Sequence, residues 1–364
     1  MRHKLASVIV VAAVLAGWAA GPAFAAGWVL QTTPNPAGVT LPDLNGVSCV
    51  SASYCIAVGD GLSGANLAPI AEYWNGSTWG LQTAADPAGA ELNGVACPAV
   101  SNCIAVGTDN AGALAEHWNG STWAQQTAAE PAGAWLEAVA CPSTTSCYAV
   151  GRDTAGTLAE HWNGSTWVQE TTPGGSGTSL TGVSCPSATN CTAVGQEYTA
   201  KGWIIGLAEH WNGSTWASQT FDNPYIDDQP FGVSCGSATT CTAVGYELTT
   251  TGVSSTLIDY WNGSTWTTQS SSNSAATLWG VSCTSATSCT GVGVAGVSQT
   301  LSGTFAEHWN GSTWATQSTP NPSGYETAVL EGVSCPTATD CTAGGYWETA
   351  PQTNEKTLAE QYTG

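Results

Sequence analysis

One stretch of sequence decides the fold: it reads LTGVSC at residues 180–185, CTAVG at 191–195 and LAEHWNGSTW at 207–216. Close variants of this stretch occur seven times along the chain. The first cysteines of the copies are Cys49, Cys97, Cys141, Cys185, Cys235, Cys283 and Cys335. The copies therefore lie 44 to 52 residues apart. Repeats of about 40–50 residues that contain several short strands are typical of β-propeller blades.

The two ends of the chain share the last copy. That copy ends with LAEQYTG at residues 358–364, before its final strand, and GWVLQTTP at residues 27–34 matches the missing piece. An N-terminal strand that completes the last blade closes the ring and leaves no unpaired edge. The sequence therefore predicts an all-β, seven-bladed propeller with four antiparallel strands per blade, closed by the N-terminal strand. In this fold Trp28 lies close to Tyr362.

The N-terminus is typical of a secretory signal peptide. Arg2 and Lys4 precede an apolar run at residues 5–16, and AFA at residues 23–25 provides a cleavage site. We expect residues 1–25 to be removed and residues 26–364 to form the propeller. The apolar run is shorter than a membrane span. The mature protein is therefore expected to be secreted, extracellular and independent of a membrane.

The cysteines form seven pairs, each with the spacing C-x5-C. The pairs are Cys49/Cys55, Cys97/Cys103, Cys141/Cys147, Cys185/Cys191, Cys235/Cys241, Cys283/Cys289 and Cys335/Cys341. Zinc sites use four ligands and more closely spaced pairs. Exported proteins commonly oxidise such pairs instead. The spacing predicts one disulfide per blade, closing a hairpin and contributing about 2 kcal/mol. We expect no metal site and no cofactor.

Charge excludes one class of partner. The chain has 26 Asp and Glu but five Lys and Arg, and its formal net charge is −21. Such a surface repels the phosphates of nucleic acids, so we expect no nucleic-acid partner. It also disfavours association between copies, which predicts a monomer.

Each copy repeats a tryptophan pair, as in WNGSTW at residues 74–79. Asn-Gly between β-rich flanks is a strong hairpin signal, although the sequence leaves open a loop of two or of four residues. The tryptophans could form a row of sugar-stacking rings. Their recurrence at the same strand positions instead favours a core between the blades.

An acid and a histidine precede the first tryptophan of most copies. The histidine position also holds Tyr73, Tyr260 or Gln361, which is incompatible with a shared catalytic role. The recurrent acids are Glu72, Glu116, Glu160, Glu209, Asp259, Glu307 and Glu360. We expect these acids to accept hydrogen bonds from neighbouring blades or turns.

The chain resembles secreted actinobacterial β-propeller repeat proteins built from cysteine pairs and AEHWNGSTW units. It also resembles, more distantly, the Asp-box hairpin of sialidase-type propellers, whose consensus ends in Gly-x-Thr-Trp, as residues 76–79 do. The position of the defining acid is Trp74. Sialidases bind the substrate carboxylate with three arginines, and Arg152 is the one arginine after the leader. The resemblance thus implies a propeller and excludes sialidase activity.

Propeller geometry sorts the loops onto two faces. The cysteine turns and the Asn-Gly-Ser-Thr loops share one face and barely vary. The connections from the second to the third strand, and from each blade to the next, share the other, which we call the variable-loop face. Loops held by a rigid scaffold commonly carry binding sites. The predicted binding residues are Glu197, Tyr198, Trp203, Phe221, Tyr225, Asp227, Asp228, Trp279 and Trp347.

Aromatic rings beside carboxylates are typical of sugar-binding surfaces. The sequence therefore predicts a non-catalytic binding or interaction module for a glycan or an extracellular protein. The alternative is a glycoside hydrolase or lyase that uses Asp227 or Asp228 with Glu197, because hydrolysis requires two suitably spaced carboxylates. No common hydrolase, metalloprotease or phosphate-loop motif is present. We therefore expect no catalytic residues.

Overall fold

The computed structural model describes residues 26–129, 131, 133–221, 227–248, 254–296, 301–349 and 354–364. Within these ranges every regular element is a β-strand, as the sequence predicted. The described residues contain no helix that is long and apolar enough to cross a membrane. The predicted signal peptide, residues 1–25, lies outside the described residues.

The strands form successive four-stranded antiparallel units, and we name each unit by its first strand. The β3 unit consists of β3 (Gly46–Ser51), β4 (Tyr54–Ser63), β5 (Asn66–Trp74) and β6 (Trp79–Gln82). The β7 unit consists of β7 (Glu91–Ala99), β8 (Asn102–Thr108), β9 (Ala113–Trp118) and β10 (Trp123–Gln126). The β11 unit consists of β11 (Trp135–Ser143), β12 (Ser146–Arg152), β13 (Thr157–Trp162) and β14 (Trp167–Glu170). The β15 unit consists of β15 (Thr178–Ser187), β16 (Asn190–Tyr198), β17 (Ile204–Trp211) and β18 (Trp216–Gln219). The β19 unit consists of β19 (Asp227–Ser237), β20 (Thr240–Leu248), β21 (Ser254–Trp261) and β22 (Trp266–Thr268). The β23 unit consists of β23 (Ala276–Ser285), β24 (Ser288–Gly296), β25 (Ser302–Trp309) and β26 (Trp314–Gln317). The chain ends with β27 (Thr327–Thr337), β28 (Asp340–Glu348) and β29 (Lys356–Thr363), which are joined by β1 (Gly27–Gln31).

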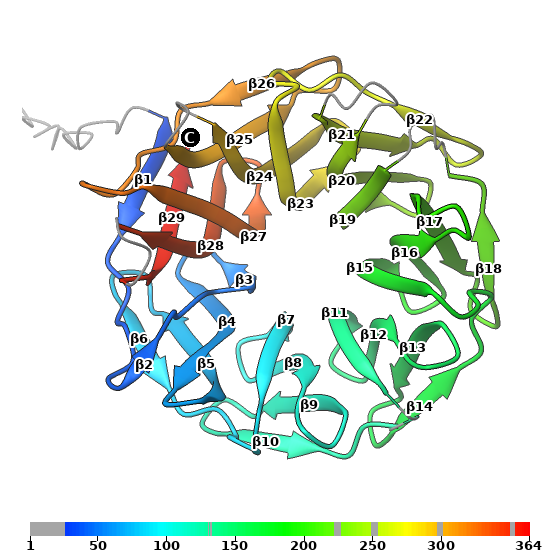
Figure 1. Ribbon diagram of the computed structural model, residues 1–364, viewed down its shortest axis with the longest axis horizontal. Helices are drawn as coiled ribbons and strands as arrows, with labels where there is room; N and C mark the ends of the chain where they lie inside the picture. The colour runs from blue at the N-terminus through cyan, green and yellow to red at the C-terminus, as the bar shows by residue number, and fades with distance from the viewer. Residues whose placement is uncertain are drawn as a thin grey trace, which may run out of the picture.

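The units stand around a common centre, with the first strand of each unit innermost (Figure 1). Consecutive inner strands contact one another, and β27 contacts β3. The inner strands carry the small residues of the Gly-Val-Ser segment because neighbouring backbones approach closely there. A Cβ added to Gly94, for example, would lie 3.1 Å from Ala138 Cα of the next unit.

The N-terminal strand completes the unit at the C-terminus. β1 pairs antiparallel with β29, and Trp28 lies opposite Tyr362. Their ring centroids are 5.6 Å apart. The expected proximity of Trp28 to Tyr362 is therefore confirmed, and the unit begun by β27 gains its fourth strand from the opposite end of the chain.

Two features of the sheets were not predicted. Single parallel bridges join neighbouring units, between Ile204 of β17 and Asp227 of β19 and between Ser302 of β25 and Thr327 of β27. A short strand, β2 (Val39–Thr40), also adds to β4. All three additions lie on the variable-loop face, where longer hairpins extend far enough to pair with an adjoining segment.

The predicted disulfides are all present, and each closes the turn between the first and second strands of a unit. The bonds join Cys49 to Cys55, Cys97 to Cys103, Cys141 to Cys147, Cys185 to Cys191, Cys235 to Cys241, Cys283 to Cys289 and Cys335 to Cys341. The described residues contain no free cysteine. One hairpin staple per unit, as the spacing predicted, is therefore confirmed.

The second cysteine of each pair belongs to the core, although the turn that the pair closes is polar. These seven residues are all buried, each at most 3% exposed: Cys55, Cys103, Cys147, Cys191, Cys241, Cys289 and Cys341. They lie near the start of the second strand, where the side chain points between units; Cys55, for example, packs with Trp74 and Trp79. Their burial agrees with the structural role that the sequence predicted for the cysteine pairs.

The Asn-Gly-Ser-Thr turn is the second repeated structural feature of the face opposite the variable-loop face. In the first unit Trp74 pairs with Trp79, so the connecting loop has four residues. The Asn75 side chain accepts bonds from the amides of Ser77 (2.9 Å) and Thr78 (3.0 Å), and only the glycine of the loop has positive φ. The asparagine side chain therefore replaces backbone partners inside the turn.

A belt of Trp–Gln hydrogen bonds links the outer strands of successive units. The indoles of six fourth-strand tryptophans each donate to a glutamine at the end of the preceding fourth strand. The bonds are Trp79–Gln31 (2.6 Å), Trp123–Gln82 (2.9 Å), Trp167–Gln126 (2.8 Å), Trp266–Gln219 (3.0 Å), Trp314–Gln269 (2.8 Å) and Trp28–Gln317 (2.9 Å). β1 takes part at both ends, through Trp28 and Gln31. The repeated tryptophans thus pack between units, as predicted.

The belt has one break, at Trp216. Glutamine is replaced at the preceding position by Glu170, and the buried Trp216 Nε1 has no hydrogen-bond partner. The Glu170 carboxylate lies 3.9 Å from His161 Nδ1 instead. This single substitution therefore leaves one buried donor unsatisfied.

The recurrent acids are buried, and Glu116, Glu160, Glu209 and Glu307 accept hydrogen bonds from the preceding unit or its connection. Glu116 accepts from the Ala85 amide (2.9 Å), and Glu209 accepts from the Thr157 hydroxyl (2.9 Å). Glu307 accepts from the Ser272 amide (2.9 Å) and from two serine hydroxyls. The predicted acceptor role is confirmed at these positions.

Candidate binding face

A single long hairpin positions three of the predicted binding residues on the variable-loop face. Glu197 and Tyr198 end β16, and Trp203 lies in the turn that leads to β17. Tyr198 is 58% exposed and Trp203 is 43% exposed. Asp227 joins this group, because it pairs with Ile204 directly after Trp203. The structure therefore brings four of the predicted residues to one corner of the face.

Two predicted residues are not exposed. Phe221 is 6% exposed, and its ring packs on Trp266 with centroids 5.2 Å apart. Asp228 is completely buried on β19. The prediction of surface contacts is wrong for both residues: Phe221 follows β18 and packs inward on Trp266, and strand alternation turns Asp228 of β19 inward. Tyr225 lies outside the described residues.

The last two predicted residues lie elsewhere on the face. Trp347 borders a cavity of about 490 Å³ beside Lys356, whose Nζ lies 5.2 Å from the centre of its ring. Trp279 lies on β23 and lines the central cavity of the ring. The predicted residues therefore do not form one site. They occupy three separate places on the variable-loop face.

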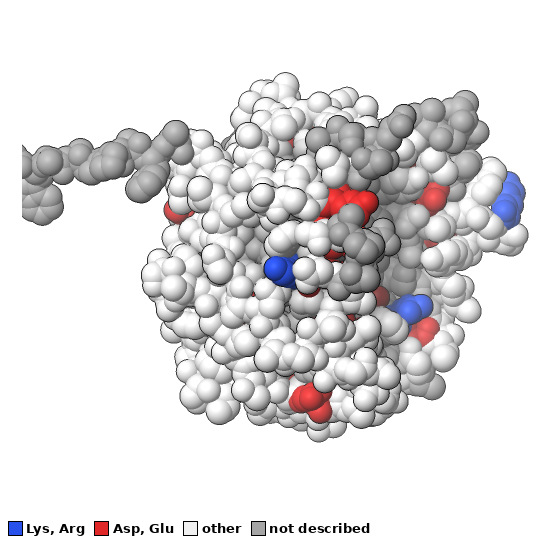
Figure 2. Space-filling model, turned by 60° about the vertical axis from the view of Figure 1, so that its left-hand side comes forward, with Lys and Arg blue, Asp and Glu red and all other residues white. Residues whose placement is uncertain are grey.

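Every cation of the described residues covers a tryptophan. Arg152 lies 4.9 Å from the ring centre of Trp135, and Lys201 lies 4.9 Å from that of Trp203. Lys356 covers Trp347 in the same way. Cation–π contacts of this kind contribute about 0.5–1 kcal/mol at exposed sites. Figure 2 shows Lys and Arg as isolated spots on a surface that is largely uncharged.

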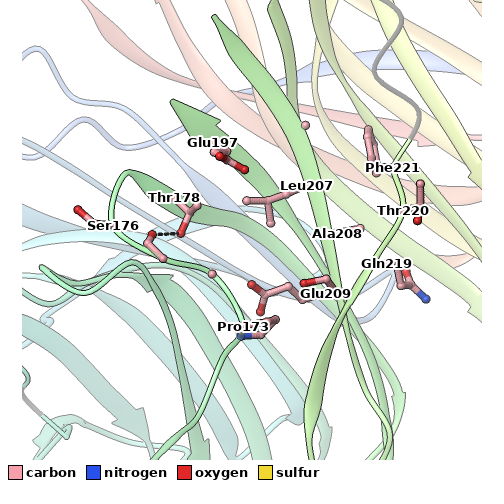
Figure 3. A pocket seen from close by; sticks show the side chains of 14 residues that line it. Pro173, Ser176, Thr178, Glu197, Leu207, Ala208, Glu209, Gln219, Thr220 and Phe221 are labelled. Atoms are coloured by element: carbon pink, nitrogen blue, oxygen red, sulfur yellow. Dashed lines mark hydrogen bonds between the residues drawn. The ribbon is translucent and has the colours of Figure 1, made fainter. Parts of the chain in front are cut away.

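A cavity of about 400 Å³ lies beneath the β16–β17 hairpin (Figure 3). Its lining includes Glu197, Glu209 and Phe221. Burial raises the pKa of Glu209 to about 7, against the lowering effect of its bond from the Thr157 hydroxyl. Glu209 is one of the recurrent acids, and its carboxylate makes a structural hydrogen bond with Thr157. The presence of Glu197 and Glu209 in the lining therefore does not identify the two as a pair of catalytic carboxylates.

A second cavity, of about 360 Å³, lies on the other side of Tyr198. Arg152, Asp153, Gln196 and Tyr198 contribute to its lining. The buried Gln196 Oε1 has no hydrogen-bond partner in the structure. This cavity therefore offers an exposed aromatic ring, a guanidinium, a carboxylate and an unused acceptor within one hollow.

Apart from Trp279, the sequence reasoning missed the residues that surround the centre of the ring. Each first strand from β7 to β27 has a β-bulge directly before its glycine or, in β11, alanine. A bulge re-aims one side chain out of the regular alternation. The bulge residues are Asn93, Glu137, Thr181, Phe231, Trp279 and Glu331, and Asn45 holds the corresponding position directly before β3. The available signal was the most variable position of a Leu-x-Gly-Val segment that otherwise changes only at Pro230 and Ala138.

Acids surround one side of this centre. Burial raises the pKa of Asp43 well above its usual value, and the nearby charge of Glu331 raises it further. Burial also raises the pKa of Glu331 to about 7, with further contributions from Asp60 and Glu355. Within the described ranges, no group of His, Cys, Asp and Glu side chains has the arrangement of a metal site.

Known structures share this architecture. A structure described as YCF48 bound to D1 peptide aligns with a TM-score of 0.58 at 11% identity, covering 93% of this chain and 95% of that chain. YCF48 from Cyanidioschyzon merolae gives a TM-score of 0.55 at 11% identity, covering 93% and 99%. The structure of U3-55K gives 0.61 at 8% identity, covering 93% and 98%. The fold is of the propeller type.

At these identities the likeness establishes the fold alone. No protein-family model matches the chain, and no curated protein matches its sequence. Function must therefore be argued from the site itself.

Proposed function

We propose that this protein is a secreted, non-catalytic binding module that holds an extracellular protein partner on its variable-loop face. In this proposal residues 1–25 are removed as a signal peptide, and residues 26–364 form a seven-bladed propeller. The seven disulfides support an oxidising compartment such as the extracellular space.

One observation carries the proposal: the large exposed aromatic side chains of the described residues all belong to the variable-loop side. They are Tyr198, Trp203 and Trp279, each more than one third exposed. Exposed aromatic residues are enriched at the centres of protein interfaces. The repeated turns of the opposite face carry Ser, Thr and Asn instead. The fold neighbour YCF48, described as bound to a peptide, supports a protein partner for this architecture.

A glycan is the second candidate, and the cavity beside Tyr198 favours it. A tyrosine ring for stacking, with the Asp153 carboxylate and the free Gln196 Oε1 for hydroxyl groups, is a combination suited to a sugar. The enzyme alternative loses one of its carboxylates, because Asp228 is buried.

Binding of the mature protein to immobilised peptide and glycan arrays tests the proposal. We expect ligands whose binding is lost in the triple variant Tyr198→Ala, Trp203→Ala and Trp279→Ala. A control that changes Ser77, Ser121 and Ser165 to Ala alters only the Asn-Gly-Ser-Thr loops and should bind normally. Binding that depends on the control positions would contradict the proposal, as would release of products from a polysaccharide substrate.

A further inference from the structure

The bulge residues around the central cavity divide into those that link units and those that do not. Asn45 donates to Leu92 O (3.0 Å), Asn93 donates to Leu136 O (2.9 Å) and Thr181 donates to Pro230 O (2.7 Å). Each bond joins one unit to the next, so these side chains are occupied by structural contacts. The cavity that the inner strands enclose has a volume of about 200 Å³.

Two neighbouring units carry aromatic bulge residues instead. Phe231 and Trp279 stack with ring centroids 4.4 Å apart and an interplanar angle of 14°. Trp279 remains 37% exposed. Bulky aromatic rings are usually buried, because their transfer from water is strongly favourable. This stacked pair is therefore an open apolar platform at the centre of the ring.

The platform adjoins an acid on its other side. The bulge residue of the next unit is Glu331, and a Cβ added to Gly280 would lie 2.7 Å from Glu331 O. The Glu331 and Asp43 carboxyl groups interact electrostatically with each other, and both interact with Asp60 and Glu355. Around the axis the order is therefore aromatic, aromatic and acidic.

The protein supplies no cation to these acids. All three cations of the described ranges cover tryptophans, and the one ion pair found there joins His161 to Glu170. Acids held close together without a counter-ion attract a cationic group from outside, and this attraction is strongest where water is partly excluded.

We propose that the centre of the variable-loop face, formed by Phe231, Trp279, Glu331 and Asp43, binds a cationic segment of an extracellular protein. An apolar side chain of this segment lies on the Trp279–Phe231 platform, and a neighbouring lysine or arginine pairs with Glu331 and Asp43. The inference rests on the proposed function and specifies the partner's chemistry. Charge complementarity favours this occupant over a neutral glycan, which leaves the acids without a counter-charge.

Two labelled probe peptides test the inference by fluorescence anisotropy. One is an eight-residue peptide of alternating Lys and Phe, and the other replaces each Lys by Glu. We expect the mature protein to bind the lysine peptide, and to bind it more weakly as NaCl rises from about 20 to about 200 mM. The glutamate peptide should bind at least tenfold more weakly, because like charges repel across an interface.

Variants locate the site. Trp279→Ala should weaken binding of the lysine peptide about thirtyfold, as truncation of a central aromatic residue does. Glu331→Gln should weaken it about fivefold and reduce its dependence on salt. The controls are Asp340→Asn, on a cysteine turn of the opposite face, and Val168→Ala, on the outer strand β14, and both should bind like the wild type. Melting temperatures establish that each variant is folded.

Three results would overturn the inference. Equal affinity for the two peptides would show that the acids do not select a cation. Unchanged binding in both the Trp279→Ala and Glu331→Gln variants would place the site elsewhere. If Tyr198→Ala alone abolished binding, the variable-loop face would remain the binding surface but its centre would not be the site, so failure of this inference is distinguishable from failure of the proposed function.

Discussion

At the scale of single residues, the repeat makes exceptions visible. Six tryptophans donate to a glutamine of the preceding outer strand, and Trp216 does not, because Glu170 stands in the glutamine position. A buried unsatisfied donor costs about 1–3 kcal/mol. The other units thus show that a glutamine side chain at position 170 would accept a hydrogen bond from Trp216 Nε1.

Glu170→Gln should therefore stabilise the protein by about 1 kcal/mol, since the glutamine Oε1 can accept from Trp216 Nε1. The measurement is the free energy of unfolding in urea at neutral pH. The reciprocal change Gln126→Glu, next to Trp167, is the matched control and should not stabilise. A Glu170→Gln variant no more stable than the wild type would show that the break in the belt has no energetic cost.

The recurrent acids predict a dependence of stability on pH. Burial raises the pKa of Glu72 and Glu360 from 4.5 to about 8, against the lowering effect of one threonine hydroxyl each. Because the folded state holds these protons more tightly than the unfolded state does, stability falls as pH rises from 4.5 through 8. Burial lowers the pKa of His117 below 6.5, as it does for the other described histidines, and this opposes the trend below that pH.

The clean window for a test therefore lies above about pH 7.5, about one unit above the ordinary histidine pKa, where the histidines are mostly neutral in both states. The urea midpoint should fall between about pH 7.5 and about 8.5, and Glu360→Gln should reduce that fall by removing one of the titrating groups. A midpoint that stays constant or rises over this range would contradict the burial of neutral carboxyl groups.

At the scale of elements, sequence reasoning was most accurate where chemistry allowed one local solution. The cysteine spacing predicted the hairpin staples, and the tryptophan positions predicted the core between units. The sequence did not determine the length of the loop after Trp74, because Asn-Gly permits a loop of two or of four residues. In the structure Trp74 pairs with Trp79, so the loop has four residues, 75–78. Phe221 and Asp228 were misplaced because the direction of a side chain near a strand end depends on register, which loop length does not reveal.

The disulfides can be tested one hairpin at a time. Replacing Cys185 and Cys191 by Ala should lower the free energy of unfolding by about 2 kcal/mol, since a short closed loop no longer restricts the unfolded chain. The same change at Cys283 and Cys289, in another unit, should cost a similar amount, and the two costs should add. Thiol titration should find no free cysteine in the native wild type. An unchanged urea midpoint would show that the disulfides do not contribute to the stability of the folded protein.

At the scale of the whole molecule, the ring joins the two ends of the chain. β1 pairs with β29, and its Trp28 and Gln31 belong to the belt on both sides. This closure brings the bulge residues of separate repeats to one centre. The candidate site there could not be read from any single repeat, because Phe231, Trp279 and Glu331 become neighbours only when consecutive units pack around the axis.

Closure is tested most directly by deleting residues 26–33 and measuring thermal unfolding with and without a synthetic peptide of residues 27–34. Loss of the buried Trp28 alone should cost about 3–5 kcal/mol, so the truncated protein should melt well below the intact one. The peptide should restore most of the loss, and a peptide with Ala in place of Trp28 should not. An unchanged melting temperature after the deletion, or equal rescue by both peptides, would contradict a ring closed by the N-terminal strand.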